Sequence, residues 1–165
     1  MLPKLTIRYY GDPCLRKKSA EVKTVGPGER LFIKALTEAM YENKGVGLAA
    51  PQVGINQQIF VADTGDGLMA IINPKIIKKI GIHKMEEGCL SIPGIVVKVS
   101  RPKKIFVKYT DEDNQIVERE LTDLLARVFQ HESDHLQGKL IIDYASLTRK
   151  IKLRKELSDL KKSLK

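Results

Sequence analysis

Gln130-His131-Glu132-Ser133-Asp134-His135-Leu136 follows the pattern H-E-x-x-H. Residues four positions apart lie on one face of a helix, so the rings of His131 and His135 can point at one metal ion. Glu132 follows the first histidine and is close enough to handle a proton on a water bound to that ion. The alternative is two ordinary helical histidines beside an acidic residue. The pattern favours a metal site and does not by itself specify a reaction.

The residues around this motif predict the helix that carries it. Thr122 is a favourable N-cap, and Gly138 follows the expected end of the helix at about Gln137. Residues at helical spacing form one stripe, which contains Leu124, Val128, His131 and His135. An apolar floor is therefore expected directly beside the paired histidines.

The remaining chain alternates between helical and β-rich patterns. A first helix is predicted over 29–43, ended by Gly45. Strands are predicted over 57–62, 68–73, 75–80, 95–100, 104–109 and 115–121. Pro74 breaks the second from the third, and residues 110–114 join the last two in a hairpin. A last helix begins at about Ser146, with Leu153, Leu157, Leu160 and Leu164 at helical spacing. This order predicts an α+β fold, in which mostly antiparallel strands pack around the central metal-binding helix, with an N-terminal and a C-terminal helix.

Length and composition indicate a single catalytic domain over 1–165, with 146–165 as a basic C-terminal helix. Of the 165 residues, 42% are hydrophobic and 30% are charged, which is ordinary for a globular protein. No apolar run approaches the roughly 18 residues that span a bilayer, and the first residues lack the apolar core of a signal peptide. We expect a protein without membrane contact in the cytoplasm, or in an organelle matrix if a transit segment was removed.

The charge of the chain suggests an acidic partner. The net charge is +9, and the segment 149–165 carries eight Lys or Arg against Glu156 and Asp159. Such a surface favours contact with nucleic acid or a ribosome. Aromatic residues make up only 5% of the chain and are not clustered with the basic residues, which disfavours stacking on single strands. The sequence does not indicate an oligomeric state.

Two histidines on a helix leave room for a third protein ligand, because catalytic sites usually take three and keep one position for water. Cys89 is the leading candidate, since it lies beside a glycine among predicted strands and a thiolate binds zinc or ferrous iron strongly. Cys14, in an N-terminal loop, and His83, in a lysine-flanked stretch, are the other candidates. Cys89 can also be a small buried thiol without a ligand.

A hydrolytic site needs more than the ion. The ion lowers the pKa of bound water, the resulting hydroxide attacks a carbonyl, and Glu132 takes and later donates the proton. Charge then develops on the carbonyl oxygen, for which Gln52 and the backbone N–H of Leu90 are the candidate donors. The segment 45–54 that contains Gln52 also fits a plain glycine-rich turn or a phosphate loop, although it lacks the Gly-Lys-Ser/Thr ending of a nucleotide-binding loop.

Three stretches together resemble the signature motifs of the peptide deformylase family, in the family's order. They are Gly45-Val46-Gly47-Leu48-Ala49-Ala50-Pro51-Gln52, Glu87-Gly88-Cys89-Leu90-Ser91 and Gln130-His131-Glu132-Ser133-Asp134-His135. Asp12-Pro13-Cys14-Leu15-Arg16 also resembles the usual N-terminal stretch, and the similarity runs to about Asp143. It implies removal of the N-formyl group from the initiator methionine of newly made polypeptides.

The resemblance also implies roles for individual residues. Cys89, His131 and His135 would hold one divalent metal ion, with ferrous iron as the native ion and zinc, nickel or cobalt able to substitute. Glu132 would be the general acid/base, and Gln52 with the Leu90 amide would stabilise the oxyanion. Main-chain groups around Val46, Gly47 and Gly88 would hold the peptide. The helical stripe adds Leu124 and Val128 to the lining of an apolar methionine pocket, with Val46 and Met85 as further candidates.

The basic tail resembles bacterial family members whose terminal helix docks on the ribosome, although it also fits a charged helix packed on its own domain. Two other functions compete with deformylation. A zinc endopeptidase uses the same helix motif but takes His or Glu further along as third ligand, and 136–142 offers neither. A structural metal in an RNA-binding protein would need four protein ligands, and only three good ones are found.

Overall fold

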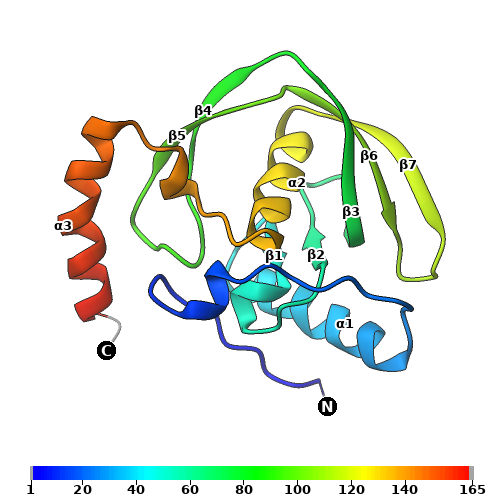
Figure 1. Cartoon of the computed structure of the whole chain (residues 1–165). Coiled ribbons are helices and arrows are strands. Elements are labelled where there is room, and N and C mark those ends of the chain that lie inside the picture. The colour runs from blue at the N-terminus through cyan, green and yellow to red at the C-terminus, as the bar shows by residue number, and fades with distance from the viewer. Residues whose placement is uncertain (1, 164–165) are drawn as a thin grey trace.

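The structure is a computed structural model that describes residues 2–163 (Figure 1). Within that range lie three α-helices, which are α1 (Pro27–Glu42), α2 (Asp123–Leu136) and α3 (Leu147–Ser163). Short 3-10 helices lie at η1 (Pro13–Arg16), η2 (Ala50–Val53) and η3 (Ile141–Tyr144). The predicted α+β class is confirmed.

The strands form two antiparallel sheets in the described part of the chain. The larger sheet has the order β1-β2-β3-β6-β7, with β1 at Gly47–Ala49, β2 at Ile59–Ala62, β3 at Met69–Ile80, β6 at Lys104–Thr110 and β7 at Ile116–Thr122. The smaller sheet pairs β4 (His83–Glu87) with β5 (Val97–Arg101). In Figure 1, α2 lies between β4 and β5 on one side and β3, β6 and β7 on the other.

Two strand predictions were wrong in detail. The strands predicted over 68–73 and 75–80 are one strand, β3, whose pairing with β6 shifts register between Ile72 and Lys75. Pro74 lies inside this shift, where its missing N–H costs no ladder hydrogen bond. Asn73 adopts φ 50°, and its side chain pairs with both the N–H and the C=O of Val22 instead. Strands β1 and β4 were not predicted at all.

Helix α1 forms where the periodicity placed it. Pro27 occupies its first turn, and Glu29 accepts a hydrogen bond of 2.9 Å from the N–H of Gly26. The side chains of Ile33, Leu36 and Met40 are buried in a cluster with β1 and β2. The helix ends at Glu42, and Lys44 rather than Gly45 takes the left-handed conformation, with φ 55°.

Helix α2 packs one face on the large sheet and turns another towards the small one. Ala126, Phe129 and Leu136 are buried in the core against β2, β3 and β6. The ring of Phe129 meets that of Phe60 edge-on, with centroids 5.1 Å apart. Thr122 is the N-cap residue, as predicted, although its side chain makes no capping hydrogen bond. The histidines lie on a rigid, doubly packed helix.

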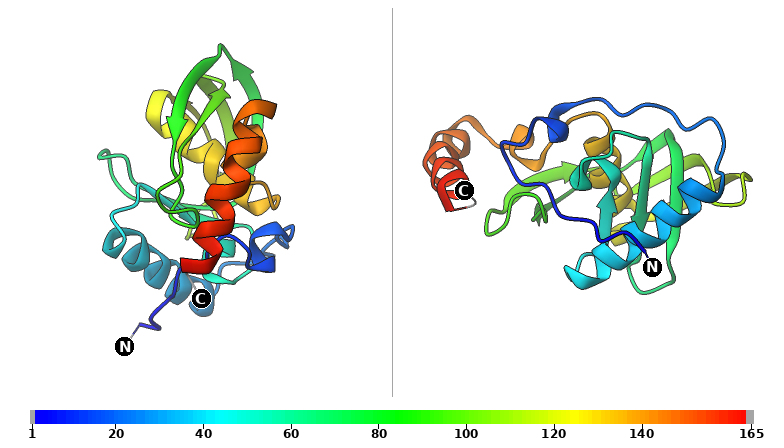
Figure 2. Two further views of the ribbon diagram at one scale, coloured as in Figure 1. Left: turned by 90° about the vertical axis from the view of Figure 1, so that its left-hand side faces the viewer. Right: turned by 90° about the horizontal axis from the view of Figure 1, so that it is seen from below.

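Helix α3 lies to one side of the body, next to η1 and the β4–β5 sheet (Figure 2). Leu153 and Leu157 are buried in a cluster with Ile92 and Val99, and Leu160 packs against its edge. Leu164, the fourth leucine of the predicted stripe, lies outside the described residues. None of the helices described is long and apolar enough to cross a membrane.

Candidate metal centre and cleft

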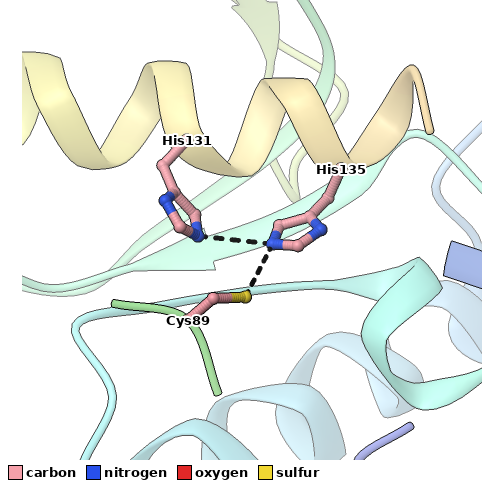
Figure 3. A group of neighbouring side chains, drawn as sticks. All are labelled: Cys89, His131 and His135. Atoms are coloured by element: carbon pink, nitrogen blue, oxygen red, sulfur yellow. Dashed lines mark hydrogen bonds between the residues drawn. The ribbon is translucent and has the colours of Figure 1, made fainter. Parts of the chain in front are cut away.

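Three metal-ligating side chains meet at one point of the fold (Figure 3). The Nε2 atoms of His131 and His135, one turn apart on α2, lie 3.3 Å from each other. The sulfur of Cys89, from the loop after β4, lies 3.3 Å from Nε2 of His135. All three ligand atoms lie within 4.8 Å of one another, so the sequence positions 89, 131 and 135 are brought together.

The other candidate ligands are elsewhere. The thiol of Cys14 donates to the carbonyl oxygen of Pro51 at 3.3 Å and is not part of the group. Burial, followed by the hydrogen bond with Asp12, raises the pKa of Cys14 to about 12, so this thiol stays protonated. His83 is exposed at the start of β4.

Glu87, the last residue of β4, holds His131 from behind. Its Oε2 lies 3.1 Å from Nδ1 of His131, which leaves Nε2 free to face the other ligands. Arg101 donates to both carboxylate oxygens at 2.6 and 2.9 Å, and Arg127 donates to Oε1 at 2.6 Å. Burial alone would raise the pKa of Glu87, but the hydrogen bonds from His131 and Arg101 outweigh it and hold the pKa at about 2. The carboxylate is therefore charged near neutral pH.

The same network extends into the motif and the C-terminal segment. Arg101 also donates to Oδ2 of Asp134 at 2.8 Å, inside H-E-x-x-H. The hydroxyl of Tyr144 donates to the same oxygen at 2.7 Å, and its ring lies 5.1 Å from the guanidinium of Arg101. Sequence reasoning missed these residues. The available signal was Arg101, which follows Val97 and Val99 on the buried side of β5, where a charge needs partners.

Glu132 is buried beside the ligands, with 4% of its surface exposed. Its Oε2 atom has no hydrogen-bond partner among the described residues. Burial raises the pKa of Glu132 to about 7, although the charges of His131 and Arg101 oppose the shift. This carboxyl group can both take up and release a proton near neutral pH.

Burial favours the neutral form of both histidines, but their pKa values shift in opposite directions. Burial lowers the pKa of His135 well below the usual value, so this ring is neutral, which is the form that binds a metal. For His131, burial also works against the charged form, but contacts with Cys89 and Glu87 raise the pKa overall. A thiol and two imidazoles that already converge suit a borderline-soft divalent ion.

Gln52 presents its amide to the same point. Its Oε1 accepts from the N–H of Ala49 at 2.9 Å, which fixes which end of the amide faces the site. Its Nε2 lies 3.2 Å from Oγ of Ser91 and 3.5 Å from the sulfur of Cys89. Leu90, the other predicted oxyanion donor, directly follows Cys89 and is half-buried.

A cavity of about 400 Å³ opens at the metal-ligand group. Each predicted substrate-contacting residue lines it, namely Val46, Gly47, Gly88, Leu124 and Val128, as does Met85. Val128 is buried, whereas Leu124 is 48% exposed, so Val128 forms the inner wall and Leu124 the rim. Arg127 lines the cavity as well and was not predicted.

Residues 4–150 match the family model described as polypeptide deformylase. The chain belongs to the peptide deformylase family. The peptide deformylase of Thermotoga maritima is 48% identical over 160 residues, covering 96% of this chain and 98% of that protein. The peptide deformylase of Fusobacterium nucleatum is 42% identical over 163 residues, covering 96% and 94%.

Solved peptide deformylases share the fold. The crystal structure from Thermotoga maritima has a TM-score of 0.85 at 48% identity and covers 87% of this chain and 99% of that chain. The one from Legionella pneumophila has a TM-score of 0.91 at 35% identity and covers 98% of each chain. Family and fold support deformylation, imply a divalent metal, and do not favour an H-E-x-x-H endopeptidase.

Proposed function

We propose that this chain removes the formyl group from the N-terminal formylmethionine of newly made polypeptides. The observation that carries the proposal is the convergence of Cys89, His131 and His135 beside the buried Glu132, whose Oε2 has no hydrogen-bond partner among the described residues. All four groups lie on the wall of, or next to, a cavity whose remaining lining is largely apolar. A hydrolytic centre of this kind suits an amide next to a methionine-sized side chain.

The metal is one divalent ion, held by Cys89, His131 and His135. Three protein ligands leave a coordination position for water or substrate, as in catalytic rather than structural sites. When bound, the ion supplies Lewis acidity, which activates water and polarises the formyl carbonyl. Ferrous iron is the native ion in this proposal, and zinc, nickel or cobalt can substitute, because thiolate with imidazole accommodates each of them.

Glu132 acts as the general acid/base. The unpaired Oε2 atom is available to accept the proton of the attacking water and to pass it to the leaving nitrogen. The carboxyl group is held in place by the close approach of β1, so it need not reorganise between the two transfers. The water attacks the formyl carbon, the C–N bond breaks, and formate and a free amino terminus are the products.

Gln52 and the backbone N–H of Leu90 stabilise the oxyanion. The Gln52 amide is preorganised by Ala49, which supports its role as a fixed donor. Main-chain groups at Val46, Gly47 and Gly88 hold the peptide. The methionine side chain enters the cavity next to Leu124 and Val128, with Met85 opposite them.

The partners are formylmethionyl nascent chains in the cytoplasm, and the chain acts as one catalytic domain with α3 as its basic C-terminal helix. On the exposed side of α3, Lys150, Lys152, Arg154 and Lys155 are free to meet an acidic surface such as ribosomal RNA. An organelle matrix fits equally if a transit segment was removed.

Formate release tests the proposal directly. The full chain is purified anaerobically, its metal content is measured by elemental analysis, and formyl-Met-Ala-Ser is offered alongside a peptide with only internal amide bonds. We expect stoichiometric formate from the first and no cleavage of the second. Cleavage of internal bonds would instead support the endopeptidase alternative.

A further inference from the structure

Arg127 is a charged residue in the wall of a largely apolar cavity. It lies on α2 three residues after Leu124 and next to Val128, on the side of the helix that faces the cleft. Only 6% of its surface is exposed. Its aliphatic stem is therefore part of the lining, and the guanidinium must be satisfied deeper in the protein.

All acceptors of this guanidinium belong to the β4–β5 hairpin. Nη2 donates to the carbonyl oxygen of His83 on β4 at 2.5 Å, and Nη1 donates to that of Val99 on β5 at 3.1 Å. Nη1 also donates to Oε1 of Glu87 at 2.6 Å. One side chain of α2 thus reaches both strands of the small sheet, which shares no ladder with the large sheet.

The hairpin supplies the opposite wall of the same cavity. Met85 on β4 and Gly88 just after it face the residues of α2 across the opening. The distance between β4 and α2 therefore sets the width of the cavity. Arg127 fixes this distance, because its side chain extends from α2 and hydrogen-bonds to the hairpin. Arg101, the other guanidinium on Glu87, does not line this cavity; it lines a separate one on the far side of α2.

We propose that Arg127 is a specificity-determining residue. Its aliphatic stem lines the cavity and its guanidinium holds the hairpin to α2, and together they set the size of the first side chain that the cleft admits. This inference rests on the proposed deformylase function and names the element that limits its substrate range. Removing the guanidinium leaves two backbone carbonyls and one oxygen of Glu87 without this donor, so the hairpin must move to find other partners. Arg101 still holds Glu87 against His131, so the metal ligands keep their orientation.

The structure supplies a matched control. Arg127→Met keeps the stem and removes the charge, Arg127→Ala also deepens the cavity, and Arg127→Lys keeps a charge with shorter reach. Arg101→Met removes a guanidinium from the same carboxylate without altering the cavity lining. A residue with a merely structural role would behave in the same way as this control.

The test compares formyl-Met-Ala-Ser with formyl-Phe-Ala-Ser on metal-loaded, full-length protein, with kcat and KM measured separately. We expect the preference for methionine, as a ratio of kcat/KM values, to fall about tenfold in Arg127→Ala and Arg127→Met, mainly through a lower KM for the phenylalanine peptide. The ratio of kcat/KM values for Arg127→Lys should lie between those of these variants and that of the wild type. Arg101→Met should lower kcat for both peptides and leave the ratio unchanged.

Thermal unfolding and metal content are recorded for every variant. If Arg127→Met and Arg127→Ala do not fold, Arg127→Lys alone decides through its ratio. An unchanged ratio in the folded Arg127 variants, or an equal change in Arg101→Met, would overturn the inference. Failure of the proposed function is a different result, because then the unmodified protein releases no formate from either peptide.

Discussion

The backbone of Gly47 lies directly against the carboxylate of Glu132. A methyl group placed on Gly47 would stand 2.5 Å from Oε1 of Glu132 and 2.8 Å from Cγ1 of Val128. A Cβ atom essentially never comes within 3.0 Å of a non-bonded atom, so any larger residue forces the carboxylate or β1 to move. The glycine of the first motif and the glutamate of the last are therefore fitted to each other.

Gly47→Ala should reduce turnover much more than stability. Because Glu132 is displaced from its position beside the ligands, we expect kcat for formyl-Met-Ala-Ser to fall on the order of 10²-fold. Gly28→Ala is the matched control, since its added methyl group would meet nothing within 4 Å. Steady-state kinetics and thermal unfolding of both variants check this, and equal kcat values in the two would show that Glu132 tolerates the shift.

Glu132→Ala should keep the metal and lose nearly all activity. Glu132 is not one of the three ligand residues, so its loss leaves the sulfur and both Nε2 atoms in place. Without a group to transfer the proton, we expect kcat to fall by about 10²–10⁴-fold. Elemental analysis and formate release are measured on the same preparation. Full activity in Glu132→Ala would remove it from the mechanism.

The two cysteines should respond oppositely to the same change. Cys89→Ser replaces a soft thiolate with a hydroxyl, which is a poorer ligand for the proposed ions, so metal retention on dialysis should fall. Cys14→Ser should retain the metal and the activity, because Cys14 is not part of the metal-ligand group and its thiol donates to the carbonyl oxygen of Pro51 instead. Metal per chain after dialysis is the readout. Loss of metal from Cys14→Ser instead would mean that the wrong thiol was assigned.

The sequence predicts local features of the site well and its long-range partners less well. The histidine helix follows from residues four apart, a relationship that a single helix satisfies alone. Cys89 is 46 residues from His135, so the residues alone made it only the leading candidate ahead of Cys14 and His83, and the resemblance to a known family singled it out. The sequence analysis did not predict the ion-pair network of Glu87, Arg101 and Arg127, because each partner lies on a different element, namely β4, β5 and α2. A charged residue in a strand or helix normally indicates an exposed position.

The strand errors have a similar origin. Pro74 indicates a break when read locally, because it cannot donate to a ladder. In the structure the strand continues through Pro74, because the register shift against β6 places Pro74 where no N–H donor is needed. That shift depends on a partner strand 30 or more residues away in the sequence. Strand β4 is short and mostly exposed, so its sequence carries no clear alternation, and its pairing with β5 defines it.

The exposed side of the C-terminal helix should contact the ribosome, whereas its buried side should contribute to the stability of the fold. Lys152, Arg154 and Lys155 are exposed, so replacing all three with Glu should weaken co-sedimentation with ribosomes strongly, and more so at higher salt. Turnover of formyl-Met-Ala-Ser should stay near that of the wild type, because none of these residues lines the cavity.

Truncation before Lys150 is a less clean test, because it also removes Leu153 and Leu157 from the core. Each buried leucine replaced by alanine costs roughly 2–5 kcal/mol, so the shortened chain should unfold at lower temperature whatever its partners. The matched control for the triple variant is Lys75, Lys78 and Lys79 changed to Glu, an equal change of charge at exposed positions on β3, which lies across the molecule from α3 in Figure 1. If both triple variants lose co-sedimentation equally, overall charge accounts for the contact, and α3 has no docking role of its own.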